Sequence, residues 1–179
     1  MRPSSITFLL AVTVLLLHHH LLPGVEASVE TACRDAANSS PNVKYDFCVA
    51  ALRSNPGSGS ADKKGLAVIA ASLTKDKATS ASTKAKSLLA KTSDPKTKQC
   101  LETCESVYED VLSDIDVAIP AIKEGRLGDA KTNLSAAVDA PDTCEDGFKD
   151  LKVPSPLTKE DSDLTQMSII ALAFTNLLG

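Results

Sequence analysis

The stretch 93–124 carries the pattern that most constrains the fold, a row of apolar residues at alternating steps of three and four. The row consists of Leu101, Cys104, Tyr108, Val111, Ile115, Ala118 and Ile122. This spacing places one narrow apolar stripe along a single long helix. Ser93 or Asp94 can cap that helix, and Pro95 suits its first position. Because such a stripe needs other helices packed against it, the pattern predicts a helical bundle.

Three further segments show a similar periodicity. Residues 62–91 contain no proline and predict one long helix, with Lys77 as the place where a weaker apolar pattern favours a break. Residues 127–150 continue the rhythm, but Pro141 predicts a kink or a restarted helix there. Residues 158–178 carry the last stripe. Four long helices with short connections predict an all-α, up-down-up-down four-helix bundle over residues 61–179.

A short helical hairpin is expected before the bundle. Its helices are predicted at residues 28–37 and 41–52, the second beginning at Pro41. Residues 54–60 read SNPGSGS, and the proline, the glycines and the small polar side chains predict a linker. Residues 28–60 therefore form the hairpin and linker of a single domain that extends over residues 28–179.

The first 27 residues are expected to be a secretory signal peptide. Arg2 supplies a short positive region, residues 6–17 are an apolar run, and Val25-Glu26-Ala27 offers small residues at a cleavage site. The run of twelve is too short to cross a bilayer, which needs about 20 residues. The mature chain is thus expected to start near Ser28, to be secreted to the extracellular space, and to have no membrane partner.

The composition of the mature chain argues against an enzyme. All three histidines lie within residues 18–20, so none remains after cleavage. Without histidine, a Ser-His or Cys-His nucleophile and a His-bound metal are excluded, which leaves only carboxylate or Ser-Lys catalysis open. We expect no catalytic residue, metal or cofactor. The acidic pairs Asp114/Asp116 and Asp161/Asp163 lack the glycine turn of a calcium loop. We expect them to be solvated carboxylates on helix faces.

Charge is unevenly distributed along the chain, although the net charge is only −4. Residues 74–98 hold seven lysines and two aspartates, whereas residues 99–150 hold thirteen acidic and four basic residues. An acidic face of this kind favours a basic partner. Nucleic acid is disfavoured because few aromatic residues accompany the lysines and the chain is expected to be exported.

Five cysteines in an exported chain suggest two disulfides and one free thiol, for which fifteen connectivities are possible. Cys33 and Cys48 pair most simply, because they are close in sequence and flank a probable loop. Cys104 and Cys144 then join two long helices. Cys100, one turn before Cys104, is left as a free thiol.

Two glycosylation sequons begin at Asn38 and Asn133. Asn38 is expected to lie in a loop, where a glycan can be attached. Asn133 falls in the middle of a predicted helix beside its apolar stripe, so we do not expect it to be modified.

Several motifs occur in a fixed order along residues 28–179. They are a cysteine pair around PNVKYDFC, then SNPGSGSAD, DPKTKQCLETC, DAPDTCEDGF, and an apolar helix ending in NLLG. This order resembles the plant invertase and pectin methylesterase inhibitors, including the pollen-allergen-like members named "putative invertase inhibitors". The resemblance implies a hairpin and a four-helix bundle, the bridges Cys33–Cys48 and Cys104–Cys144, and a non-covalent complex that covers the active cleft of a cell-wall enzyme. Cys100 departs from the four-cysteine pattern of the family.

The resemblance leaves two targets, and we expect pectin methylesterase rather than acid invertase. Invertase inhibitors of the family carry Pro-Lys-Phe near the turn into the third bundle helix, whereas residues 125–129 read GRLGD here. By position, Asp110, Thr143 and Asp146 match residues associated with the surface that binds pectin methylesterase. The less specific interpretation is that Thr143 caps a restarted helix and both carboxylates are merely solvated.

Two other functions stay open at this point. The protein could be a non-inhibitory wall protein that holds pectin, a polyanion, through the lysines of residues 74–98. A small-molecule carrier is the weaker alternative, because the stripes indicate a filled core.

Overall fold

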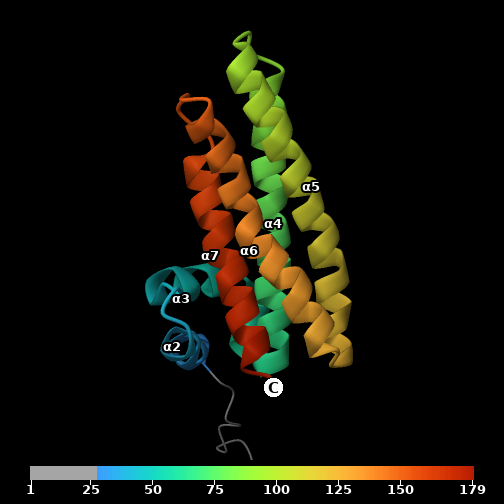
Figure 1. The fold of residues 1–179 in the computed structure, drawn as a ribbon. Coiled ribbons are helices and arrows are strands. Elements are labelled where there is room, and N and C mark those ends of the chain that lie inside the picture. Colours follow the sequence, from blue (N-terminus) through green and yellow to red (C-terminus); the bar gives the residue numbers. More distant parts are fainter. Residues whose placement is uncertain (1–27) are drawn as a thin grey trace, which may run out of the picture.

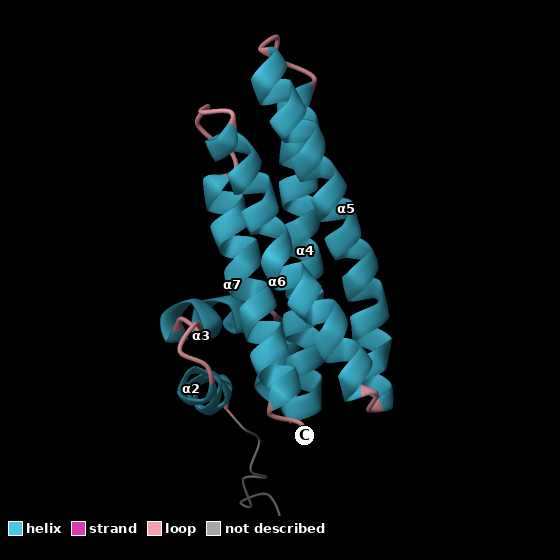
Figure 2. Ribbon diagram, viewed as in Figure 1, coloured by secondary structure: helices cyan, strands magenta, loops and turns pink. Residues whose placement is uncertain are grey.

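The computed structural model describes residues 28–179, so the expected signal peptide lies outside the described residues. Its elements are α2 (Val29–Ser39), α3 (Tyr45–Arg53), the 3-10 helix η1 (Pro56–Ser60), α4 (Lys63–Leu89), α5 (Pro95–Glu124), α6 (Leu127–Asp150) and α7 (Thr158–Asn176). Figure 2 shows only helices and loops in this part of the chain. The all-α prediction is confirmed.

The four long helices run alternately up and down and form one bundle (Figure 1). Each packs against two neighbours, in the cyclic order α4, α5, α6, α7. The hairpin formed by α2 and α3 lies against one side of the bundle and contacts α7 and α4. The predicted four-helix bundle with a preceding helical hairpin is therefore confirmed.

Helix α5 buries the apolar stripe that the sequence indicated. All seven stripe residues are inaccessible to solvent and belong to the core. Asp94 is the N-cap and accepts a hydrogen bond from the Thr97 N–H at 2.8 Å. The helix ends at Gly125, whose φ of 79° lies in the left-handed region that favours glycine.

The single long helix predicted for residues 62–91 is confirmed as α4, whereas the restart predicted at Pro141 of α6 does not occur. Helix α4 continues through Lys77, because the small side chains of Thr74, Ala78 and Ala81 are buried there and supply the contact face. Helix α6 continues through Pro141, so the restarted helix was a wrong prediction. A proline removes one backbone donor, and the packing of buried Pro141 within the bundle keeps the helix intact.

The hairpin differs from the prediction at two points. Helix α3 begins at Tyr45 rather than Pro41, since residues 41–44 form a turn held by Gln166 of α7. The Gln166 amide accepts from the Lys44 N–H at 3.3 Å and donates to the Asn42 carbonyl at 3.4 Å. The expected linker instead contains η1, in which the Asn55 side chain accepts from the Gly57 N–H at 2.9 Å.

Helix α7 is buried on more than the one face that its stripe predicted. The expected stripe residues Leu164, Met167, Ala171 and Phe174 are buried, and so are Gln166, Ser168, Ile170, Ala173 and Thr175. The reason is that α4 and α6 cover one side of this helix while the hairpin covers another.

The structure pairs Cys33 with Cys48 and Cys104 with Cys144, at Cα–Cα distances of 5.8 and 4.6 Å. Cys100 is unpaired and buried. Asn38 lies exposed in the last turn of α2, so placing it in a loop was wrong, and its glycosylation stays a prediction. Within residues 28–179, none of the helices has the length and apolar character needed to cross a membrane.

Candidate functional site

A shallow groove runs between α5 and α6 on the outside of the bundle. It is lined by Val107, Asp110, Ser113 and Asp114 from α5 and by Ala136, Asp139, Ala140 and Thr143 from α6. These residues lie beside the buried stripes of the two helices, which the Cys104–Cys144 disulfide ties together. The disulfide therefore holds the two helices that line the α5–α6 groove at a fixed spacing.

Two of the three interface residues predicted from the sequence meet in this groove. Asp110 and Thr143 line it from opposite helices, and both are exposed. Thr143 lies within the continuous helix α6, so it does not cap a restarted helix. Asp146 lies one turn further along α6, outside the groove lining, with 68% of its side chain exposed and Lys149 at 3.8 Å. The predicted patch of three residues is thus brought together only in part.

The groove is acidic and its charge is not compensated. Asp110, Asp114 and Asp139 all line it, and within the described residues none of them makes an ion pair. Partial burial, followed by the nearby charge of Asp110, raises the pKa of Asp114. Carboxylates that form no ion pair within the described residues, on two helices held by a disulfide, favour binding of a basic partner.

Asp114 and Asp139 were missed as members of this site by the sequence interpretation. Asp114 was expected to be fully solvated, but it is half-buried. The available signal was the register of the two helices. Counting six residues along α5 from Cys104 reaches Asp110, and six back along α6 from Cys144 reaches the neighbourhood of Asp139. Antiparallel helices joined at a bridge bring such positions together.

The lysines of α4 are largely occupied by ion pairs with the neighbouring helices. The pairs are Lys75–Asp116, Lys86–Glu105 (3.5 Å) and Lys86–Glu109 (3.2 Å) with α5, and Lys77–Asp163 (3.0 Å) and Lys84–Glu160 (2.7 Å) with α7. Each exposed pair contributes little free energy, but together they match the basic helix to its acidic neighbours. The lysine-rich segment of the sequence is therefore paired with acidic side chains of the neighbouring helices within the fold.

A second polar cluster is buried where α5, α6 and α7 meet. Asp161 is 2% exposed, and its Oδ1 accepts a hydrogen bond from the Tyr108 hydroxyl at 2.5 Å. The prediction that Asp161 is solvated was wrong. One ligand atom each of Cys144, Glu145 and Asp161 lies within 4.8 Å of the others, but the Cys144 sulfur belongs to the disulfide and is not a thiolate.

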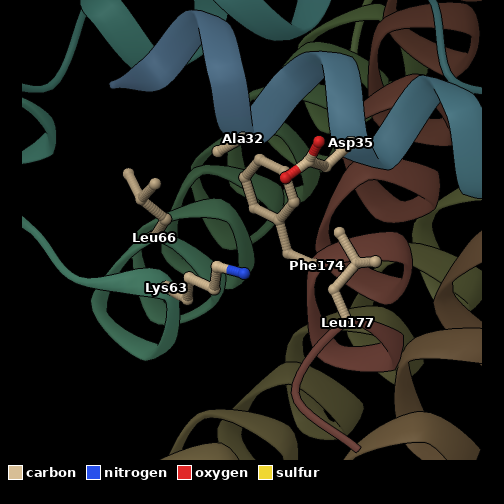
Figure 3. Close-up of a pocket in the computed structure, with 6 residues that line it drawn as sticks. All are labelled: Ala32, Asp35, Lys63, Leu66, Phe174 and Leu177. Carbon is tan, nitrogen blue, oxygen red and sulfur yellow. The ribbon is translucent and has the colours of Figure 1, made fainter. Parts of the chain in front are cut away.

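An apolar pocket lies at the junction of the hairpin and the bundle. Figure 3 shows the Phe174 ring extending from α7 toward α2, with Leu66 and Lys63 of α4 on one side. The remaining lining residues are Ala32, Asp35 and Leu177. None of the site residues predicted from the sequence lies in this pocket.

The fold and the cysteine framework agree with a known family. The family model described as "Plant invertase/pectin methylesterase inhibitor" matches residues 27–174. The chain belongs to this family. Its members inhibit enzymes, pectin methylesterases or invertases, and are not enzymes themselves.

Individual family members are similar to this chain over most of their length. The "Putative invertase inhibitor" of Platanus orientalis is 42% identical over 152 residues, which cover 84% of this chain and 89% of the relative. "Pectinesterase inhibitor 8" of Oryza sativa subsp. japonica is 33% identical over 156 residues, 87% of this chain and 85% of the relative.

A solved structure supports the same fold. The crystal structure of mutant form A of a pectin methylesterase inhibitor from Arabidopsis superposes with a TM-score of 0.70 at 24% identity. The superposition covers 84% of this chain and 96% of that one. At this level of identity the likeness concerns the fold of the family member and not its target.

Proposed function

We propose that this protein is a secreted inhibitor of a plant pectin methylesterase and that it covers the enzyme's active cleft with the α5–α6 groove in a non-covalent complex. The observation that carries this proposal is the groove itself, in which three carboxylates without an ion-pair partner lie between two helices joined by a disulfide. A basic side chain of the enzyme that enters the groove gains charge-assisted hydrogen bonds from Asp110, Asp114 and Asp139.

The rigidity of the groove favours tight binding. Both helices are continuous, and the Cys104–Cys144 bridge fixes their spacing, so little conformational entropy is lost when the partner binds. An interface of standard size buries about 1,600 Å² and depends on a few central residues. Asp110 and Thr143, which face each other across the groove, are the residues we assign to that centre.

The turn between α5 and α6 supports pectin methylesterase over invertase. Residues 125–129 contain neither the proline nor the phenylalanine of the family's invertase-binding motif. Arg126 pairs there with Glu124 at 2.9 Å and with Asp129, so the turn is closed by charged side chains that bind each other. Such a turn presents charged side chains, and its single apolar side chain, Leu127, is partly buried.

Acid invertase is the alternative target, and one observation favours it. Two relatives from Platanus, at 42% and 41% identity, carry the name "Putative invertase inhibitor", whereas the relatives named for pectinesterase that match most of the chain are 27–33% identical. Parallel inhibition assays with a pectin methylesterase and an acid invertase separate the two. Inhibition of invertase alone would overturn our choice of target.

A non-inhibitory pectin-binding protein has less support. That function requires free cationic side chains between residues 74 and 98, and four of the seven lysines there are engaged with α5 or α7. Reversing the charge of Lys84 or Lys86 would place a carboxylate beside Glu160 or Glu109 and disturb the bundle rather than a binding surface.

Charge reversal in the groove tests the proposed interface. We expect Asp110→Lys and Asp139→Lys each to weaken inhibition of pectin methylesterase about 30-fold, which corresponds to about 2 kcal/mol for a central interface residue. Asp146→Lys should have a smaller effect because Asp146 lies outside the groove lining. Both Asp110 and Asp139 are exposed, so the variants should retain the thermal stability of the wild type.

The matched control is Asp76→Lys, which makes the same charge change at an exposed position of α4 away from the groove. This control corrects for the altered net charge and its long-range attraction to the enzyme. Unchanged inhibition by the Asp110→Lys/Asp146→Lys double variant, or equal weakening by the control, would contradict the proposed interface.

A further inference from the structure

Three helices meet at a buried polar cluster that the proposed interface does not use. Tyr108 of α5, Glu145 of α6 and Asp161 of α7 form it beside the Cys104–Cys144 disulfide. Tyr108 and Asp161 are buried, and the Tyr108 hydroxyl lies 2.5 Å from Asp161 Oδ1 and 3.3 Å from Cys144 Sγ. The Tyr108 hydroxyl has only one proton. It donates that proton to Asp161, because a carboxyl oxygen is a stronger hydrogen-bond acceptor than the Cys144 sulfur.

Two carboxyl oxygens of this cluster have no partner within the described residues. Asp161 Oδ2 and Glu145 Oε1 are both buried and make no hydrogen bond, while Glu145 Oε2 accepts from the Thr158 hydroxyl at 3.0 Å. The two residues are close enough for their carboxyl oxygens to lie within 4.8 Å. Two carboxylates at this separation repel each other, and their unbonded, buried oxygens have lost the hydration of the unfolded chain.

No cation of the surrounding helices compensates this charge. The nearest further acid on α7 is Glu160, which also disfavours a charge on Asp161. Glu160 itself is paired with Lys84 of α4 at 2.7 Å, and no lysine or arginine is among the groups that act on Asp161 within the described residues. Helix α5 contributes Tyr108 and helix α6 contributes Glu145, neither of which is positive. The cluster therefore needs a positive charge that residues 28–179 do not supply.

We propose that Asp161 and Glu145 share one proton, so that Asp161 Oδ2 donates a hydrogen bond to Glu145 Oε1. This carboxyl clasp satisfies both unpartnered oxygens with a single proton and removes one of the two buried charges. It also completes a chain of hydrogen bonds across three helices, from Tyr108 on α5 through Asp161 on α7 and Glu145 on α6 to Thr158 at the start of α7.

The electrostatics of Asp161 agree with the clasp. Burial raises the pKa of Asp161 to about 8, the Tyr108 hydrogen bond opposes this, and contact with Glu145 adds to it. In the unfolded chain the same group has its ordinary pKa of 3.8. Because the folded pKa is the higher one, the folded state holds one more proton between these two values. The clasp contributes its full stability below about pH 4 and loses it progressively as the pH rises through about 8.

The clasp thus makes the α6–α7 contact sensitive to pH. Ionisation of Asp161 places a second negative charge beside Glu145 in a dry site, and the two helices can relieve the repulsion only by separating or admitting water. The device is internal to the inhibitor and does not require the enzyme.

Asp161→Asn is the decisive variant, because asparagine imitates the protonated acid. Its carbonyl can accept from Tyr108 and its NH₂ group can donate to Glu145, but it cannot ionise. We expect the unfolding equilibrium constant of the wild type to rise, relative to this variant, by up to tenfold per pH unit between about pH 5 and pH 8. Chemical denaturation at a series of pH values measures this difference.

Asp163→Asn is the matched control on the same helix. Burial disfavours a charge on Asp163, but hydrogen bonds from Lys159 and Lys77 outweigh it and hold its pKa below the ordinary value. Removing this ionised, paired carboxylate should lower stability at neutral pH. Stability should still fall between about pH 5 and pH 8, as in the wild type. A parallel pH dependence in the wild type and in Asp161→Asn would overturn the shared proton.

A spectroscopic measurement covers the case in which Asp161→Asn does not fold. The clasp predicts an infrared C=O band of a buried carboxylic acid at pH 6 in the wild type. The pH at which this band disappears should be lower in Glu145→Gln, because the amide can donate to the Asp161 carboxylate and the neighbouring negative charge is removed. Absence of the band in the wild type would overturn the proposal. So would stabilisation of the wild type, but not of Glu145→Gln, by added Ca²⁺, since the pair would then hold a metal ion instead of a proton.

Discussion

Replacing both cysteines of the Cys104–Cys144 bridge by serine tests which covalent link the fold depends on. This bridge closes a segment of 40 residues and joins α5 to α6 in the centre of the bundle, where both cysteines are fully buried. The Cys33–Cys48 bridge closes only 15 residues and joins the two short helices of the hairpin. The two replacements are chemically identical, so each is the natural control for the other.

The magnitudes follow from the lengths of the two closed segments. In the chain-entropy description, a bridge over 40 residues stabilises the fold by about 4 kcal/mol and one over 15 residues by about 3 kcal/mol. A change of 1 kcal/mol shifts the Tm of a domain of this size by about 2–4 °C. Loss of Cys104–Cys144 should therefore lower the Tm by about 8–16 °C, and loss of Cys33–Cys48 by at most about 6–12 °C.

The position of the hairpin should increase the difference in Tm between the two double variants. It packs on the outside of α7 and α4, so its helices can separate while the four long helices stay folded. Calorimetry should then show the main transition of Cys33→Ser/Cys48→Ser close to that of the wild type. Both pairs are best compared with Cys100→Ala in the background, because the Cys100 thiol could otherwise exchange with the remaining disulfide. Equal losses of Tm in the two double variants would refute the reasoning.

Two further predictions concern single buried positions. Cys100 is 2% exposed, and burial raises the pKa of its thiol. The thiol should therefore resist alkylation in the native protein and react fully after denaturation. Rapid alkylation of the native protein would contradict the buried position of Cys100. Ile115→Ala removes a fully buried side chain from the middle of the α5 stripe and should lower the free energy of unfolding by about 2–5 kcal/mol in urea titrations, whereas the exposed neighbour Asp116→Ala should cost far less.

The sequence by itself determined the helical class and the central helix. The stripe from Leu101 to Ile122 repeats at a spacing that only a helix can bury on one side, and Asp94, Pro95 and Gly125 mark its ends through local backbone chemistry. These signals need no knowledge of the rest of the chain. The same holds for the absence of histidine from residues 28–179 and for the order of the cysteine motifs.

Predictions failed where the outcome depends on tertiary contacts with other helices. Pro141 is a helix breaker in isolation, yet it lies within α6 because the tertiary contacts of that helix outweigh one lost backbone hydrogen bond. The lining of the α5–α6 groove, our proposed interface, was predicted only in part for the same reason. Asp110 and Thr143 were identified by position, but Asp114 and Asp139 became members of the groove only through the register of α5 against α6.

The burial of Asp161 shows most clearly what only the tertiary structure decided. Along the sequence Asp161 and Asp163 are two similar carboxylates on one helix, and the only local difference is Lys159, which lies four residues before Asp163 and pairs with it. In the fold, Asp163 lies between Lys77 and Lys159, while Asp161 points into a junction that contains Tyr108 and Glu145 but no cation. The charge state of a carboxyl group depends on the solvent and the charges within a few ångströms of it. Apart from Lys159, those neighbours come from helices distant in sequence, so packing decides that Asp161 is buried without a cation while Asp163 keeps its charge.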